Sequence, residues 1–210
     1  MSTLEQSVAA QLLQIKAVKL NVEKPFVWAS GWLSPIYCDN RKTLSFVEVR
    51  SFFTAEFVRL IRKQFPDVQV IAAVATGAIA QGALVANALN LPFVYVRPAP
   101  KDHGLKNLIE GDLQAGQKTV VIEDLISTGE SSVKVVETLQ NAGAQVLGML
   151  AIFTYNFPQA VERFAQAKIK LTTLCNYEAI INQAVKMNYI SENQLDILKQ
   201  WHANPQIFGK

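Results

Sequence analysis

The sequence predicts an α/β fold in which a central, mostly parallel sheet is flanked by helices on both faces. The first observation is a set of short, mostly apolar runs, which are typical of strands buried on both faces. The second is that segments with helical spacing of apolar residues separate these runs. Strands that alternate with helices build a parallel sheet between helical layers. The expected strands are residues 68–74, 93–96, 119–122, 146–153 and 169–174, and the expected helices between them are residues 78–89 and 131–142.

Three segments precede this core. Residues 4–20 repeat apolar side chains at helical intervals and predict an amphipathic helix. Residues 25–41 predict two short extended segments around Gly31, and Pro35 keeps its predecessor out of the helical region. Residues 45–65 return to helical spacing.

The chain length predicts one domain over residues 1–210. Half of the residues are hydrophobic, which is enough for a substantial core. We divide the domain into an N-terminal helix and extended segments (1–45), an α/β core (65–175) and C-terminal helices (176–210).

Composition excludes several classes of protein. The net charge of +3 is too small to indicate nucleic-acid binding. Cys38 and Cys175 lie too far apart in sequence to suggest a disulfide framework or a zinc site, which favours a reducing cytoplasm. The N-terminus lacks the pattern of a signal peptide. Residues 70–96 carry no charge, but glycine, asparagine and proline interrupt them, so we expect no membrane span.

Ligands of parallel sheets bind beyond the carboxyl ends of the strands, where the loops gather. Three loops are expected there, at residues 75–78, 97–111 and 123–131. These loops also hold the chemically unusual stretches of the chain.

Residues 120–132, VVIEDLISTGESS, combine an apolar strand with two adjacent acids, Glu123 and Asp124, and a run of hydroxyl residues and glycine. We expect the strand to end at Ile122 and the run to enter the next helix. Backbone N–H groups at a helix start are unpaired and attract a phosphate. In one alternative, the hydroxyls only cap the helix and the acids are solvated. In another, the acids hold magnesium beside a P-loop, but the chain contains no GxxxxGK(S/T) motif.

The whole stretch resembles the signature with which type I phosphoribosyltransferases bind phosphoribosyl pyrophosphate (PRPP). The resemblance implies the fold of that family, with a small N-terminal hood over the base. In the family, the acidic pair binds the 2′ and 3′ hydroxyls of ribose, and the loop binds the 5′ phosphate. It implies that Glu123 and Asp124 hold the diol, and that Asp124 takes part in catalysis. The other expected PRPP contacts here are Leu125, Ile126, Ser127, Thr128, Gly129, Glu130 and Ser131.

The segment VRPAPKDHG places Arg97, Lys101 and His103 in a loop that prolines keep extended and Gly104 lets bend. A solvated loop is one interpretation, and an active-site lid is the other. The segment resembles the lid of the branch of the family that uses orotate as acceptor, although Pro98 stands where that branch has a second cation. The resemblance implies that the lid reaches into the partner subunit of a homodimer and grips pyrophosphate. Arg97, Lys101 and His103 are then expected to be catalytic and to bind PRPP.

The segment ASGWLSPIYCDNR resembles the base-side segment of the same branch. Two positions depart from one bacterial pattern: Ala29 replaces a lysine, and Tyr155 replaces an arginine that meets the orotate carboxylate. Arg41 is our candidate for the counter-charge, with a plain surface arginine as the alternative. Tyr37 could equally be core. The expected orotate-binding residues are Ser127, Tyr37, Cys38, Arg41 and Tyr155.

The segment VATGAIAQG stands where the family has its pyrophosphate loop. Thr76 and Gly77 are expected to bind PRPP through backbone N–H groups at a second helix start. Some relatives have a lysine where Gly77 stands, so the contact would be made by the main chain. A tight structural turn is the alternative.

The resemblance implies transfer of the phosphoribosyl group from PRPP to orotate, with orotidine 5′-monophosphate and pyrophosphate as products. Mg²⁺ is the expected cofactor, bound mainly through PRPP and without direct side-chain ligands. A purine phosphoribosyltransferase and a regulator that uses PRPP as a signal are the rival interpretations. Neither nucleic acid nor a membrane is an expected partner.

Overall fold

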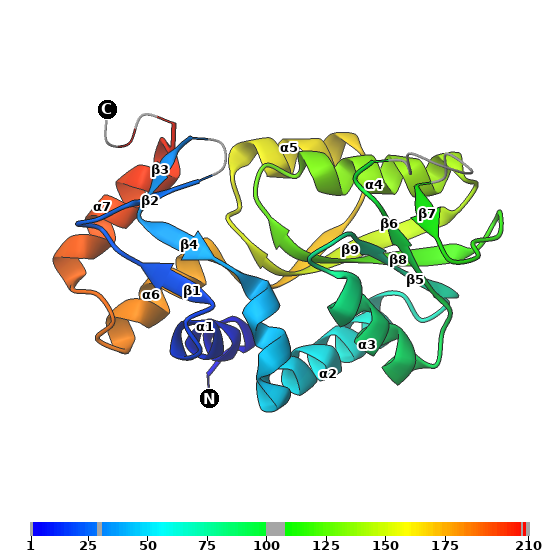
Figure 1. Ribbon diagram of the computed structural model, residues 1–210, viewed down its shortest axis with the longest axis horizontal. Helices are drawn as coiled ribbons and strands as arrows, with labels where there is room; N and C mark the ends of the chain where they lie inside the picture. Colours follow the sequence, from blue (N-terminus) through cyan, green and yellow to red (C-terminus); the bar gives the residue numbers. More distant parts are fainter. Residues whose placement is uncertain (1, 29–30, 100–107, 207, 209–210) are drawn as a thin grey trace.

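The computed structural model describes residues 2–28, 31–99, 108–206 and 208. Its centre is a six-stranded sheet with the strand order β10-β9-β8-β5-β6-β7 (Figure 1). The strands are β5 (Val70–Val74), β6 (Phe93–Val96), β7 (Ile109–Glu110), β8 (Lys118–Ile126), β9 (Gln145–Thr154) and β10 (Leu171–Asn176). All neighbouring strands of this sheet pair in parallel except β6 and β7, which pair antiparallel. The predicted α/β class with a mostly parallel sheet is confirmed.

Strand β8 continues past Ile122, where the sequence analysis ends it. Glu123 pairs with Ala151 and Leu125 with Phe153 of β9. The predicted boundary is wrong because the long neighbour β9 supplies ladder partners through the acidic pair, and a strand ends where its partners end. The acids therefore lie within the last residues of a strand, where the backbone is held on a rigid element.

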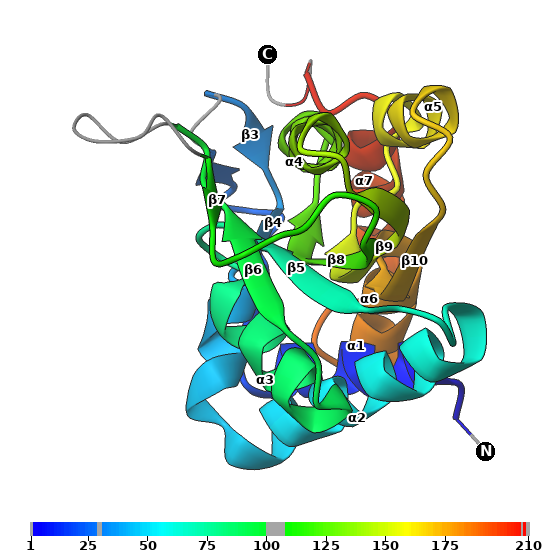
Figure 2. The same cartoon turned by 90° about the vertical axis from the view of Figure 1, so that its right-hand side faces the viewer.

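Helices cover both faces of the sheet (Figure 2). Helices α2 (Val47–Gln64) and α3 (Ile79–Leu89) cover one face, and α4 (Glu130–Asn141) and α5 (Pro158–Gln166) cover the other. Side chains of β5 alternate between two cores: Ile71 and Ala73 belong to the first, and Val70 and Ala72 to the second. This alternation follows from the period of two residues in a strand. Helix α5 lies in a stretch for which the sequence analysis predicts no element.

The N-terminal part contains α1 (Leu4–Gln14), four short strands and a 3₁₀ helix, η1 (Asn40–Ser45). The strands, which we call the hood, are β1 (Val18–Leu20), β2 (Phe26–Val27), β3 (Leu33–Ser34) and β4 (Ile36–Cys38). They form two antiparallel pairs, β1 with β4 and β2 with β3. The predicted helix over residues 4–20 is too long, because Lys16 turns the chain with φ 55° and β1 then pairs with β4.

Two C-terminal helices, α6 (Tyr177–Lys186) and α7 (Glu192–Ala203), lie beside the hood (Figure 1). The buried Trp201 donates its indole N–H to the carbonyl oxygen of Leu33 at 3.1 Å. Tyr177 donates its hydroxyl to the carbonyl oxygen of Leu198 at 3.0 Å. Through the hydrogen bond from Trp201 to Leu33, helix α7 therefore holds the β2–β3 hairpin in place. No helix in the described part of the chain is long and apolar enough to cross a membrane.

Candidate active site

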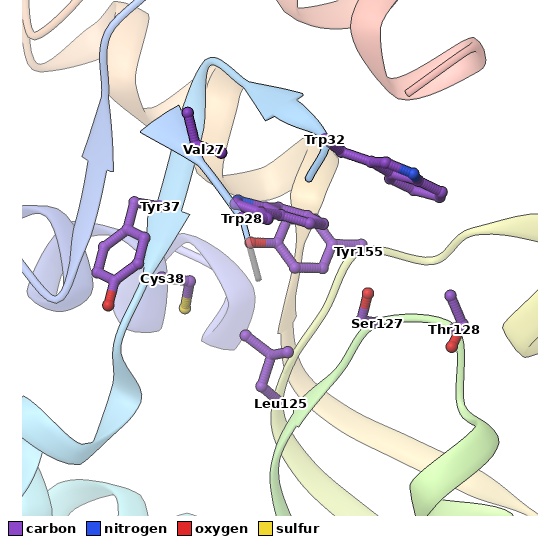
Figure 3. Close-up of a pocket in the computed structure, with 9 residues that line it drawn as sticks. All are labelled: Val27, Trp28, Trp32, Tyr37, Cys38, Leu125, Ser127, Thr128 and Tyr155. Atoms are coloured by element: carbon purple, nitrogen blue, oxygen red, sulfur yellow. The ribbon is translucent and has the colours of Figure 1, made fainter. Parts of the chain in front are cut away.

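A cavity of about 650 Å³ lies between the hood and the carboxyl end of β8 (Figure 3). Hood residues line one side, and residues from the ends of β8 and β9 line the other. The lining residues are Val27, Trp28, Trp32, Tyr37, Cys38, Leu125, Ser127, Thr128 and Tyr155. Four of the five residues expected to bind a base are among them, and Arg41 is not.

Aromatic rings dominate this cavity. The rings of Trp28 and Tyr155 lie 5.1 Å apart, and those of Trp28 and Trp32 lie 6.4 Å apart and nearly parallel. Trp28 donates its indole N–H to the carbonyl oxygen of Ile36 at 3.1 Å, which fixes the ring against the hood. Burial raises the pKa of the Tyr155 phenol well above its usual value, so this wall is uncharged. The sequence analysis missed both tryptophans, although Trp32 lies inside the base-side segment and Trp28 adjoins it.

Arg41 lies outside the cavity wall. Its guanidinium Nε donates to the Asp39 carboxylate at 2.9 Å, and its side chain is 60 % exposed. Its charge nevertheless acts on Asp124, where it opposes the upward shift of the pKa caused by burial.

The two acids differ in their surroundings. Glu123 is only 4 % exposed, and its carboxylate accepts hydrogen bonds from the Asp124 N–H and the Ser132 hydroxyl, both at 2.9 Å. Burial, followed by the neighbouring Asp124, raises the pKa of Glu123 well above its usual value. Burial also raises the pKa of Asp124, against the opposing effects of the Glu123 hydrogen bond and the Arg41 charge, so both acids take up protons more readily than isolated carboxyl groups.

A hydrogen-bonded link ties the acidic pair to the hood. Asn40 is buried and donates its side-chain amide to the Asp124 carbonyl oxygen at 2.6 Å. The Cys38 thiol donates to the side-chain oxygen of Asn40 at 3.2 Å. Burial also raises the pKa of the Cys38 thiol, which keeps it protonated as a donor.

The loop between β5 and α3 packs directly against Asp124. A methyl group added at Gly77 would overlap the Asp124 carboxylate, so only glycine fits there without movement. The peptide bond between Ala75 and Thr76 is cis, and the Thr76 residue is exposed. Ala78 donates its N–H to the Val74 carbonyl oxygen at 3.1 Å, which leads the chain into α3.

The loop from Ser127 to Gly129 joins β8 to α4, which begins at Glu130. Gly129 has φ +76°, a conformation that favours glycine. Ser131 is exposed in the first turn of α4, and Thr128 borders both the aromatic cavity and a neighbouring cavity of about 620 Å³.

The expected lid is described only at its two ends. Arg97 donates its N–H to the Leu108 carbonyl oxygen at 2.8 Å and pairs with Glu110 at 3.5 Å. Arg97 also lines the neighbouring cavity. The predicted catalytic residues Lys101 and His103 lie outside the described residues.

Comparisons with known proteins agree with this geometry. A family model described as a phosphoribosyl transferase domain matches residues 54–175, which span the helix α2 and the sheet as far as β10. The fold and site thus define a phosphoribosyltransferase. The chain is 58 % identical to the orotate phosphoribosyltransferase of Phocaeicola vulgatus, over 98 % of this chain and 97 % of that protein. It is 53 % identical to that of Porphyromonas gingivalis over the full length of both. The chain belongs to the orotate phosphoribosyltransferase family.

Solved structures support the same assignment. The crystal structure of orotate phosphoribosyltransferase from Aeropyrum pernix matches with a TM-score of 0.75 at 27 % identity, over 88 % of this chain and 99 % of that one. The structure of Leishmania donovani UMP synthase matches with a TM-score of 0.79 at 23 % identity, over 95 % of this chain and 42 % of that one. Because the identity to UMP synthase is low, that match supports the fold and not the function.

Proposed function

We propose that the protein transfers the 5-phosphoribosyl group of PRPP to orotate in pyrimidine (UMP) biosynthesis, with orotidine 5′-monophosphate and pyrophosphate as products. The observation that carries this proposal is a shared wall: Leu125, Ser127 and Thr128 belong to the PRPP signature and also line the aromatic cavity. A flat pyrimidine ring in that cavity therefore lies beside a ribose held by the signature. Tyr37 and Cys38 line the cavity from the hood and Tyr155 lines it from the end of β9, and we assign all three to the base site.

The chemistry requires a bond from the base to ribose C1 to form while the bond from C1 to pyrophosphate breaks. The electron pair of the breaking bond leaves with pyrophosphate, positive charge develops on C1 and the ring oxygen, and the base nitrogen gives up its proton to solvent as it bonds to C1. The Asp124 carboxylate stabilises that charge and, with Glu123, holds the ribose hydroxyls. Ser127 to Ser131 hold the 5′ phosphate, and Thr76 and Gly77 hold pyrophosphate through the main chain.

The lid supplies the remaining groups. Arg97, Lys101 and His103 neutralise the leaving pyrophosphate and exclude water. No protein nucleophile is needed, because positioning and charge stabilisation lower the barrier. Orotate also needs a counter-charge, which we assign to Arg41 from its position near the acidic pair.

Mg²⁺ fits this site as an ion held mainly by PRPP. Among the described residues, no group of three or more His, Cys, Asp or Glu side chains is arranged to hold a metal. The acidic pair offers a few oxygen atoms at the ribose, which suits a hard cation that keeps most of its ligands from substrate and water. When bound, Mg²⁺ neutralises pyrophosphate and favours its departure.

A homodimer with a shared lid is the proposed assembly. Phe46, Val47 and Leu84 are large apolar residues that are 41 %, 60 % and 36 % exposed. They lie on α2, its N-terminal boundary and α3, where a second copy would cover them. The free cysteines Cys38 and Cys175 support a reducing, cytoplasmic setting.

An acceptor panel tests the proposed function. The protein, Mg²⁺ and PRPP are mixed separately with orotate, uracil, adenine and hypoxanthine, and pyrophosphate release is measured. We expect release with orotate and little with the other bases. Release with a purine alone would assign the site to a purine phosphoribosyltransferase, and release with none would overturn catalysis by the folded protein.

A further inference from the structure

Helix α5 packs against the loop that joins β8 to α4. Arg163, on this helix, donates a guanidinium N–H to the Thr128 carbonyl oxygen at 2.6 Å. One residue further, Phe164 lies against Gly129: a methyl group added at that glycine would come within 3.2 Å of the Phe164 ring and 3.4 Å of the Ala160 Cα. The helix therefore holds the Thr128 carbonyl oxygen by a hydrogen bond and packs against Gly129.

The direction of the Thr128 carbonyl determines where the next N–H points. In a trans peptide, the C=O and N–H bonds of one unit point in opposite directions. The cis bond of the described chain lies elsewhere, between Ala75 and Thr76. Because Arg163 holds the Thr128 oxygen toward α5, the Gly129 N–H points away from α5. Thr128 borders both cavities of the candidate site, and Glu130 and Ser131, which follow Gly129, line the second of them.

Arg163 also places a positive charge beside the loop of residues 127–129, because its guanidinium contacts Thr128. Among the described residues, it forms no ion pair with a carboxylate. Its charge reaches the first turn of α4, since it contributes to the lowered pKa of Glu130, after the larger effects of the Lys134 hydrogen bond and charge. A half-buried arginine with no acidic partner, behind a loop that resembles an anion-binding loop, favours an anion on the other side.

We propose that Arg163 is a positioning residue for the 5′ phosphate of the phosphoribosyl group. It holds the Thr128 peptide so that the Gly129 N–H is aimed at the phosphate, and it adds favourable charge from behind without touching the substrate. This inference rests on the proposed function only in placing a 5′ phosphate at residues 127–131. It concerns the phosphate end of the substrate and does not depend on which base the protein uses.

The test measures binding of two small anions in the absence of orotate. Dissociation constants for ribose 5-phosphate and for pyrophosphate are determined by calorimetry for the wild type and for Arg163→Met. We expect Arg163→Met to weaken ribose 5-phosphate on the order of tenfold, as loss of a charged hydrogen bond does. Pyrophosphate binding should change less than about twofold, because a different loop holds it.

Three further variants separate position from charge and from folding. Arg163→Gln keeps a donor but loses the charge, and Arg163→Lys keeps the charge and one donor, so both should bind ribose 5-phosphate more tightly than Arg163→Met. Arg59→Met removes a matched surface charge on α2, where Arg59 pairs with Glu56, and should leave both constants unchanged.

The outcomes decide the proposal. Equal weakening of both anions with a lower Tm would assign Arg163 a merely structural role and overturn it. Unchanged ribose 5-phosphate binding, or no such binding by the wild type, would also overturn it. A selective loss of ribose 5-phosphate binding supports it even if the protein fails to use orotate, so failure of the proposed function is seen separately.

Discussion

The acidic pair consists of two unlike groups. Glu123 is buried, and its two carboxylate oxygens accept hydrogen bonds from the Asp124 N–H and the Ser132 hydroxyl. Asp124 borders Gly77, and the charge of Arg41 acts to lower its pKa. The pKa of each acid is raised by burial, so the pair takes up one proton more readily than two isolated carboxyl groups. We propose that this makes the pair less repulsive to PRPP than its sequence suggests, while one negative charge remains to stabilise a cationic ribose.

Replacing Glu123 with glutamine should change how stability depends on pH. An acid whose pKa is raised on folding binds more protons when folded, so its contribution to the free energy of unfolding falls as pH rises above its usual value of 4.5. Glu123→Gln lacks this titration. The stability of the wild type relative to the variant should therefore decrease from pH 5 toward pH 8 in urea unfolding. A difference that is constant over this range would contradict the raised pKa.

Replacing Asn40 with leucine should disturb the position of Asp124, because Asn40 holds the Asp124 backbone. The variant leaves the partly buried Asp124 carbonyl oxygen without its donor, at a cost of about 1–3 kcal/mol in the free energy of unfolding. We expect kcat/KM for PRPP to fall as well, because the Asp124 backbone loses its anchor. Asn21→Leu, at an exposed asparagine of the same region, is the control. Equal effects of the two changes would remove the role of Asn40.

The strands of the core were predictable because burial on both faces leaves a continuous apolar run, as in Val70–Val74. The limits of elements that depend on pairing with a neighbouring strand could not be predicted in this way. Strand β8 passes through two acids because β9 continues beside it, and residues 18–20 leave the predicted first helix to pair with β4. Helix α5 was not predicted. The proposed role of Arg163 depends on its contact with Thr128, which lies far away in the sequence and which no local pattern reveals. In the candidate site, Tyr37, Cys38, Ser127 and Tyr155 line one cavity as predicted, but no local pattern indicates that Arg41 pairs with Asp39 outside it.

Helix α7 should control the base side through its contact with the hood. Trp201→Phe removes the hydrogen bond to Leu33 and part of a buried side chain, and we expect a loss of about 1–3 kcal/mol in the free energy of unfolding. The KM for orotate should rise more than the KM for PRPP, because the hairpin carries the aromatic walls. Tyr189→Phe, at a 37 % exposed aromatic residue, serves as the control. An equal rise in both KM values would argue against a base-side role for α7.

In the molecule as a whole, the candidate site lies where the hood meets the sheet. The hood and the sheet meet at the aromatic cavity, and the Asn40 link joins them at Asp124. The exposed apolar residues of α2 and α3 lie on elements that precede and follow β5, so a partner there would lie near the pyrophosphate loop.

Mixed dimers test the shared lid. Lys101→Ala and Asp124→Asn should each be nearly inactive, with kcat lowered on the order of 10²-fold or more for the lysine variant. Mixing and re-forming the two should restore one good site in each heterodimer, on the order of a quarter of wild-type activity at random pairing. Heterodimers that form without recovery would place Lys101 in the site of its own subunit.

The central claim is that this site joins orotate to the phosphoribosyl group of PRPP. Its most direct test is the ultraviolet absorbance of orotate, followed over time with protein, Mg²⁺ and PRPP, and with Asp124→Asn as the matched control. We expect a loss of absorbance that requires PRPP and is strongly reduced in Asp124→Asn. Folded wild-type protein that leaves the absorbance unchanged, or an Asp124→Asn variant as fast as the wild type, would contradict it.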